Sequence, residues 1–211
     1  MKNEIPMIEF ANAIKSVFKH DDIFNFIEIG SLHAKDSLFI KSQFKNCNPY
    51  AIDGFQDNYE KYLKNLPYIQ TFNIIINEYD VVTNFHQKDI NGLHGIFNRG
   101  DLYGKNILTN QPCKTIKTFA IENNISALDV LKIDVEGATL QVLKGAKELI
   151  DTIKIMHIET EDACFFQGQD LHDQVVDFLK NKFEMIDISK VAIQTNQHQF
   201  DSIWINKKLI K

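Results

Sequence analysis

The sequence predicts an α/β domain in which a mainly parallel sheet carries helices on both faces. Short apolar, β-branched runs alternate along the chain with segments of helical periodicity, which is the pattern of βαβ units. Acidic residues stand at the ends of five of these runs. The 211 residues, 44% of them hydrophobic, suffice for one domain with a sizeable core and are few for two.

Each expected element is a run with the period of a strand or of a helix. Strands are expected at 24–29, 48–53, 72–76, 128–134, 153–160, 183–188 and 201–206, the last two as an antiparallel hairpin. Helices are expected at 5–19, 37–45, 57–65, 115–124, 139–149 and 171–182. Asp57 is a credible N-cap of the third helix. Residues 77–112, rich in Asn, Gly and His, are expected to be irregular.

Composition excludes several classes of function. The net charge of −5 and the single arginine, Arg99, argue against a nucleic-acid binder that relies on a basic surface. The three cysteines lack metal-binding or CxxC spacing, so reduced thiols in a cytoplasmic protein are expected. No apolar run approaches the roughly 20 residues that span a bilayer, so no membrane span is expected.

The strand ends carry the residues that can do chemistry. In open parallel sheets, ligands bind beyond the carboxyl ends of the strands, at the switch point beside the first strand. The five expected ends carry Glu28-Ile29-Gly30, Asp53, Asn77-Glu78, Asp134-Val135-Glu136-Gly137 and Glu159-Thr160-Glu161. This register predicts a ligand site at that edge of the sheet.

Two of these residues indicate a nucleoside ligand. Gly30 stands where the backbone must turn, either to admit a ligand or only to make the turn. Asp53 ends the next strand, where an acid accepts hydrogen bonds from ribose hydroxyls. The alternative is that Asp53 begins a turn or caps the next helix. A dinucleotide fingerprint would need glycines at Leu32 and Lys35, which disfavours a nicotinamide oxidoreductase.

Two motifs carry a resemblance to a known family. The stretch EIGSLHA, 28–34, resembles the first motif of class I S-adenosylmethionine-dependent methyltransferases. The stretch LKIDVEGATLQVLKGAKELI, 131–150, looks very like the signature of the FkbM-type methyltransferases, and the resemblance spans roughly residues 24 to 206. It implies a Rossmann-like fold with a seven-stranded sheet. It also implies methyl transfer from S-adenosylmethionine to a hydroxyl oxygen, most often of a sugar or polyketide-like metabolite.

The resemblance also implies the domain plan and the partners. A single methyltransferase domain is expected at 23–211, preceded by a helical extension at 1–22, with 77–112 as an insert that covers the acceptor site. The expected acceptor is a small molecule, a sugar or a glycan intermediate. A relative that binds the cofactor or a glycan without turnover is the non-enzymatic alternative.

Cofactor-binding roles follow from the motif positions. The expected residues are Glu28, Gly30, Ser31, His33, Asp53, Gly54 and Phe55. Phe55 covers the adenine or is a plain core residue, and His33 lines the pocket beside the methyl group. Ala34 stands where the family usually has glycine, a mild change if its φ is negative. Leu32 replaces the usual asparagine.

Methyl transfer to an alcohol needs a positioned base. Asp134 and Glu136 lead as catalytic residues, with a structural acid and a helix cap as their alternatives. His94, in the 77–112 segment, is a further candidate base, and Arg99 a candidate acceptor contact. His157 is expected to be a hydrogen-bonded core residue. Glu159 is nearer the strand end and is the better candidate for the site. No metal is predicted, because no complete ligand set is visible.

Overall fold

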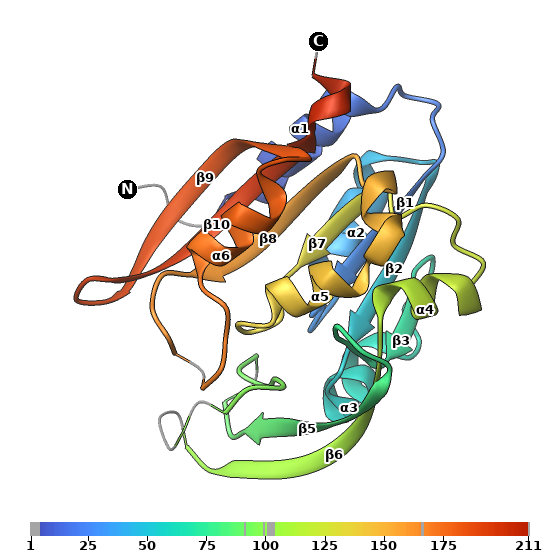
Figure 1. Ribbon diagram of the computed structural model, residues 1–211. Helices are drawn as coiled ribbons and strands as arrows, with labels where there is room; N and C mark the ends of the chain where they lie inside the picture. Colours follow the sequence, from blue (N-terminus) through green and yellow to red (C-terminus); the bar gives the residue numbers. More distant parts are fainter. Residues whose placement is uncertain (1–4, 91, 99, 101–103, 166, 211) are drawn as a thin grey trace.

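The computed structural model describes residues 5–90, 92–98, 100, 104–165 and 167–210. Its main sheet has seven strands in the order β3-β2-β1-β7-β8-β10-β9 (Figure 1). All neighbours pair in parallel except β10, which is antiparallel to both β8 and β9. The strand order reverses between β1 and β7, which creates the switch point. The predicted fold class and its closing hairpin are confirmed.

The strands of the main sheet largely coincide with the predicted runs. Their bounds are β1 Phe24–Ile29, β2 Cys47–Asp53, β3 Gln70–Asn73, β7 Val130–Ile133, β8 Ile155–Glu161, β9 Phe183–Gln194 and β10 Gln197–Asn206. The β9–β10 hairpin is longer than predicted, since both strands continue to the turn through segments of mixed polar and apolar residues. This extension matters for the site, because it carries Ile193 and Gln199 to the ligand edge of the sheet.

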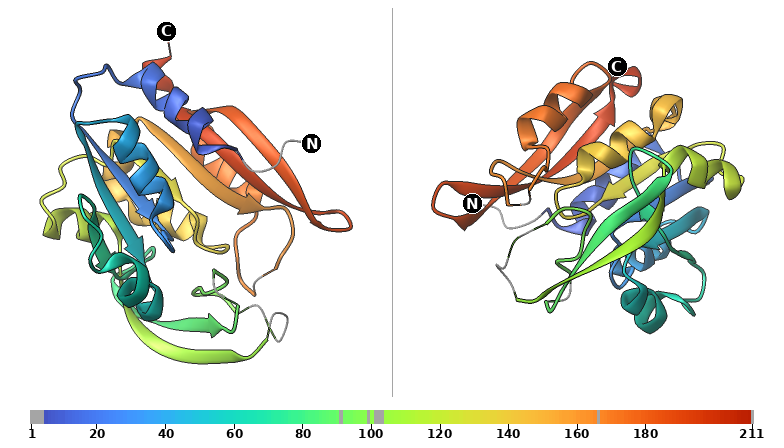
Figure 2. Two further views of the ribbon diagram at one scale, coloured as in Figure 1. Left: turned by 180° about the vertical axis from the view of Figure 1, so that it is seen from behind. Right: turned by 60° about the horizontal axis from the view of Figure 1, so that its bottom comes forward.

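Helices cover both faces of this sheet. On one face lie α1 Met7–Val17 and α2 Lys35–Gln43; on the other lie α4 Ile116–Glu122, α5 Thr139–Gly145 and α6 His172–Leu179 (Figures 1 and 2). Short 3-10 helices occur at Lys147–Thr152 and Lys207–Leu209. The alternation of strands and helices read from the sequence therefore produces the expected three layers.

The first helix packs directly on the sheet. Phe10 and Ile14 of α1 are fully buried against Phe26, Ile155 and Ile203, which come from three different strands. Burial of such side chains contributes about 1.5–3 kcal/mol each. The larger core lies on the opposite face, under α4, α5 and α6.

The third predicted strand is divided between two sheets. β3 ends at Asn73, and Ile75–Ile76 form a short strand, β4, in a second sheet of order β4-β6-β5. In that sheet β5 Val81–Lys88 pairs antiparallel with β6 Asn106–Lys114. The prediction of an irregular 77–112 segment was therefore wrong over these strands. Most side chains of β5 and β6 are exposed or half-buried, so neither strand forms a buried apolar run that the sequence could reveal.

The second sheet lies beyond the ends of β2 and β3 (Figure 1). Its own apolar cluster of Ile75, Phe85 and Cys113 packs against Phe55 and Ile96. The helix expected at 57–65 is short: α3 Gln56–Asn58 continues as one π-helical turn, Tyr59–Leu63. Asp57 falls inside the first turn rather than at its N-cap, which is Phe55. The N-cap prediction was wrong.

Candidate functional site

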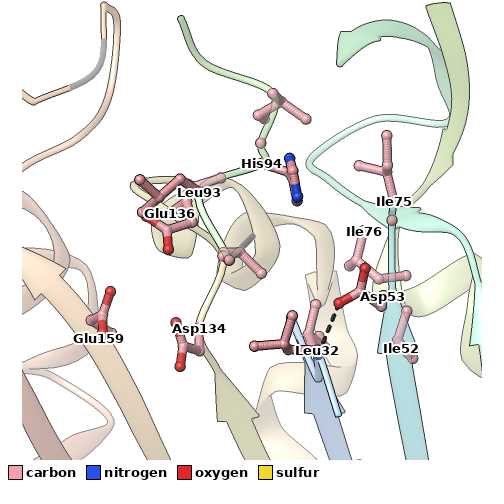
Figure 3. Close-up of a pocket in the computed structure, with 18 of the residues that line it drawn as sticks. Leu32, Ile52, Asp53, Ile75, Ile76, Leu93, His94, Asp134, Glu136 and Glu159 are labelled. Carbon is pink, nitrogen blue, oxygen red and sulfur yellow. Dashed lines mark hydrogen bonds between the residues drawn. The ribbon is translucent and has the colours of Figure 1, made fainter. Parts of the chain in front are cut away.

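A cavity of about 470 Å³ opens at the carboxyl ends of the central strands, at the switch point (Figure 3). Five of the strand-end acids line it: Asp53, Asp134, Glu136, Glu159 and Glu161. The remaining two, Glu28 and Glu78, are not among its lining residues. The structure thus brings together acids from β2, β7 and β8, as the register of the strand ends predicted.

Gly30 ends β1 with φ +83°, and its space is taken by the protein itself. A Cβ built on Gly30 would lie 1.7 Å from the carbonyl oxygen of Asp134. The main chain pairs at the same point, since the Asp134 amide donates to the Ile29 carbonyl at 2.9 Å. The close approach that requires glycine here is that of the β7 end.

Asp53 lines the cavity and accepts hydrogen bonds from two neighbouring backbone amides. Its side chain is 7% exposed, and its two oxygens accept from the Leu32 and Phe55 amides, each at 2.8 Å. Burial raises the pKa of Asp53, and these amides partly offset the effect. A carboxylate has about four lone-pair sites, so it still has capacity for ligand hydroxyls.

The first loop is held in an unusual conformation. Leu32 and Ala34 have φ of +47° and +50°. The condition under which alanine at 34 is a mild change is therefore not met: its φ is positive. A left-handed conformation costs a non-glycine residue about 1–2 kcal/mol. Leu32 lines the cavity, and the hydrogen bond that its backbone amide donates to Asp53 holds the strained loop in place.

Residues 92–96, hereafter the strap, cross the top of the cavity. Gly95 is fastened to His86 by two backbone hydrogen bonds of 2.8 and 3.1 Å. A Cβ at Gly95 would meet Glu136, and one at Gly92 would meet Leu32. The strap therefore spans from the β1 loop to the β7 loop, both of which end strands of the main sheet.

His94 extends from the strap into the space above Asp53 (Figure 3). Its Nδ1 accepts from the Lys88 amide at 3.0 Å, and its ring lies 3.9 Å from that of Phe55. Burial lowers the pKa of His94. Its Nε2 is buried with no hydrogen-bond partner among the residues that the structure describes.

A buried lysine organises the charges beneath Asp134. Lys132 Nζ lies 3.2 Å from Asp134 and 3.1 Å from Asp36. Burial lowers the pKa of Lys132, but Asp134, Asp36 and Glu28 outweigh burial and raise it. Lys132 is therefore charged and pairs with Asp134 at the cavity edge.

Glu159 lies beside Asp134, at the end of the cavity away from Asp53 (Figure 3). It accepts a hydrogen bond from the Gln199 side chain on β10. Burial raises the pKa of Glu159, and the neighbouring carboxylates of Asp134, Glu161 and Asp201 raise it further. Sequence reasoning did not find Gln199 or Phe165, both of which line this end. No local motif marks either position.

Several expected cofactor residues lie outside the cavity lining. Glu28 is buried and accepts hydrogen bonds from the amide and hydroxyl of Ser37 on α2. Burial raises its pKa to about 7. The Ser31 hydroxyl is buried without a partner within the described ranges. His33 packs on Tyr62, with ring centroids 4.1 Å apart.

Gly54 and Phe55 follow Asp53 at the same corner. Gly54 lines the cavity, and a Cβ there would lie 2.8 Å from Ile75. Phe55 lines a shallower hollow of about 380 Å³, which has His94 and Asn58 in common with the main cavity. His157 lies in the core, 5% exposed, 5.3 Å from the Phe10 ring. The hydrogen bond expected for it is not found among the described residues.

The remaining expectations concern Arg99, metals and membranes. Arg99 lies outside the described residues. Over the described parts of the chain, His, Cys, Asp and Glu form no group of three or more that could hold a metal ion. In those same parts, no helix is long and apolar enough to span a membrane.

Comparison with known proteins places this geometry in context. The sequence model described as the methyltransferase FkbM domain matches residues 35–185. No curated protein matches the chain in sequence. Many solved structures share its fold, at low sequence identity.

TrmK from M. capricolum, solved in complex with S-adenosyl-homocysteine, is 12% identical with a TM-score of 0.52, over 98% of this chain and 70% of that one. The N-methyltransferase NodS from Bradyrhizobium japonicum WM9 is 9% identical with a TM-score of 0.50, over 94% and 95%. The METTL16 methyltransferase domain is 8% identical with a TM-score of 0.50, over 97% and 70%. These likenesses confirm the Rossmann-like class I methyltransferase fold.

Proposed function

Because the chain belongs to the FkbM family of S-adenosylmethionine-dependent methyltransferases, we propose that it methylates a hydroxyl oxygen of a small molecule, a sugar or glycan intermediate. The observation that carries the proposal is the acidic acceptor end of the cavity, where Glu159 lies beside Asp134. Carboxylates accept hydrogen bonds from hydroxyl groups, and one of them can take the proton that an alcohol must lose.

The cavity fits the cofactor at its other end. S-adenosylmethionine supplies an activated methyl group on a sulfonium. Asp53 has unused acceptor capacity for ribose hydroxyls, and His94 Nε2 is a buried polar atom that lacks a partner among the described residues. Ile75 and Ile76 provide an apolar wall beside them. The protein's own residues therefore offer both the polar and the apolar surface that an adenosine requires.

Charge supports a small acceptor rather than a nucleic acid. Asp134, Glu136, Glu159 and Glu161 line the acceptor end, and none of the described lining residues is Lys or Arg. Lys132 lies beneath the wall and is already paired with two carboxylates. A phosphate-rich ligand would meet like charge here, whereas a polyhydroxylated one would meet hydrogen-bond acceptors.

Three candidates differ in their fitness as a base. Asp134 is already engaged in an ion pair with Lys132, 3.2 Å away. His94 receives a hydrogen bond at Nδ1, so the proton of its neutral ring is at Nε2. Burial and the neighbouring carboxylates raise the pKa of Glu159, which makes its carboxylate a stronger base. We therefore assign proton removal to Glu159 and orientation of the acceptor to Asp134.

The proposal is tested by measuring S-adenosylhomocysteine release in the presence of neutral sugars, amino sugars and sugar nucleotides. We expect turnover with a neutral saccharide and, in the Glu159→Gln variant, a loss of about 10²–10⁴-fold in kcat with cofactor affinity retained. Glu148→Gln, an exposed change in the helical turn after α5, is the matched control. Turnover of amino sugars alone would show that the methylated group is an amine and not a hydroxyl. Cofactor binding without turnover of any acceptor would support the non-catalytic alternative.

A further inference from the structure

His94 is fixed on three sides by the elements around it. The Lys88 amide of β5 donates to its Nδ1 at 3.0 Å, and the Phe55 ring lies against its face. The strap that carries it is fastened to His86 through Gly95. His94 also forms part of the wall between the cavity and the shallower hollow. Its ring therefore has one orientation, set by the small sheet.

This orientation determines where the ring proton is. Nδ1 faces an amide N–H, so it must present its lone pair there, and the proton of the neutral ring is at Nε2. A charged ring would bring two N–H groups face to face at Nδ1. Nε2–H is consequently a donor, and in this state it cannot remove a proton from an acceptor.

The donor is enclosed and lacks a partner among the described residues. An unsatisfied buried donor is costly, and native structures retain few of them. The nearest functional neighbours of His94 are Phe55 and the cavity corner of Asp53 and Ile75 (Figure 3). In the function proposed above, this corner binds the adenosine, and Asp134 and Glu159 line the end of the cavity that binds the acceptor.

We propose that His94 is a cofactor-binding residue, whose Nε2–H donates to an acceptor atom of the adenosine half of the S-adenosyl cofactor. Both the base and the ribose carry suitable acceptors, ring nitrogens and oxygens. Nε2 is enclosed by the residues around it, so we expect the strap to shift as the cofactor binds. His94 thereby ties the second sheet to cofactor binding. The proposal depends on the family's cofactor and is independent of the acceptor.

Two substitutions separate the ring's two nitrogens. His94→Gln places an amide N–H near the position of Nε2, whereas His94→Asn retains an acceptor near Nδ1 and loses the outer donor. By calorimetric titration with S-adenosylhomocysteine, we expect His94→Asn to bind about tenfold more weakly and His94→Gln to bind within about threefold of wild type. Equal affinities in all three proteins, or equal losses in both variants, would overturn the proposal.

A measurement on the unmodified chain guards against misfolded variants. Nitrogen NMR of the ¹⁵N-histidine-labelled protein reports which ring nitrogen carries the proton. We expect His94 to be protonated at Nε2 in the free protein and in the S-adenosylhomocysteine complex, with the Nε2 resonance shifted on binding. A proton at Nδ1, or an Nε2 signal unchanged on binding, would refute the assignment. Failure of wild type to bind would instead refute the cofactor itself.

Discussion

Gly30 and Asp134 meet so closely that a methyl group on Gly30 would lie 1.7 Å from the Asp134 carbonyl oxygen. This contact joins the ends of β1 and β7, the two strands between which the sheet order reverses. The glycine of the first motif therefore serves the convergence of two strands. Gly30 and Asp134 both line the cavity that opens at these strand ends.

Gly30→Ala should lower the free energy of unfolding by about 2–5 kcal/mol, since it combines a strained φ with a steric clash. Gly100→Ala is the matched control: Gly100 also has a positive φ, +67°, but nothing within 4 Å of a built Cβ. It should cost only the conformational term, about 1–2 kcal/mol. Urea denaturation measures both, and equal losses would show that the contact with Asp134 carries no energy.

Ala34→Gly should be close to neutral, within about 1 kcal/mol. Glycine relieves the left-handed strain at φ +50°, while the lost methyl group removes a similar amount of burial energy. Ala120→Gly, at an equally buried position inside α4, relieves no strain and should cost about 2 kcal/mol. Thermal denaturation of both variants checks the difference. If Ala34→Gly lowers the stability as much as Ala120→Gly does, Ala34 is not strained.

Asp53→Asn should weaken S-adenosylhomocysteine binding by about 10- to 100-fold, because charge-assisted hydrogen bonds contribute about 1.5–3 kcal/mol. The amide retains one acceptor oxygen for the Leu32 or Phe55 amide, so the fold should survive. Asp57→Asn makes the same chemical change outside the main cavity and should leave the affinity within about twofold. Calorimetry measures the affinities. An unchanged affinity in the Asp53→Asn variant would show that Asp53 does not bind the ribose.

Glu28 makes stability depend on pH in a defined direction. Its pKa is raised from 4.5 to about 7 on folding, so the folded state retains a proton that the unfolded state loses. Its contribution is fully present below pH 4.5 and is lost as pH rises to about 7. The total is on the order of 3 kcal/mol.

Glu28→Gln should abolish that contribution and leave a side-chain oxygen to accept from Ser37. The free energy of unfolding of wild type minus that of the variant, measured by urea denaturation from about pH 4.5 to 8, should fall with rising pH and level off above about 7. A difference that stays constant with pH would show that Glu28 titrates alike in both states.

The strand-end chemistry could be predicted from sequence because it depends on local signals. An apolar run followed by an acid places Asp53, Asp134 and Glu159 at the same edge of a parallel sheet, and the structure brings all three to one cavity. The boundary within 72–76 could not be predicted in this way. Ile75 and Ile76 are buried as fully as a strand of the main sheet, so hydrophobicity alone cannot show the change of sheet.

Contacts between distant segments could not be predicted from the sequence either. Gln199 reaches Glu159 because β10 pairs with β8 in a register that extends past the predicted strand. His94 reaches Phe55 because the β5–β6 pairing folds the strap over the cavity. Neither contact leaves a pattern within a short window of sequence.

A structure of the protein in complex with S-adenosylhomocysteine tests the central claim most directly. We expect the ribose hydroxyls on Asp53, the adenine between Ile75 and the strap, and the sulfur directed toward the space between Asp134 and Glu159. A cofactor bound outside this cavity, or one whose ribose lies away from Asp53, would contradict the account.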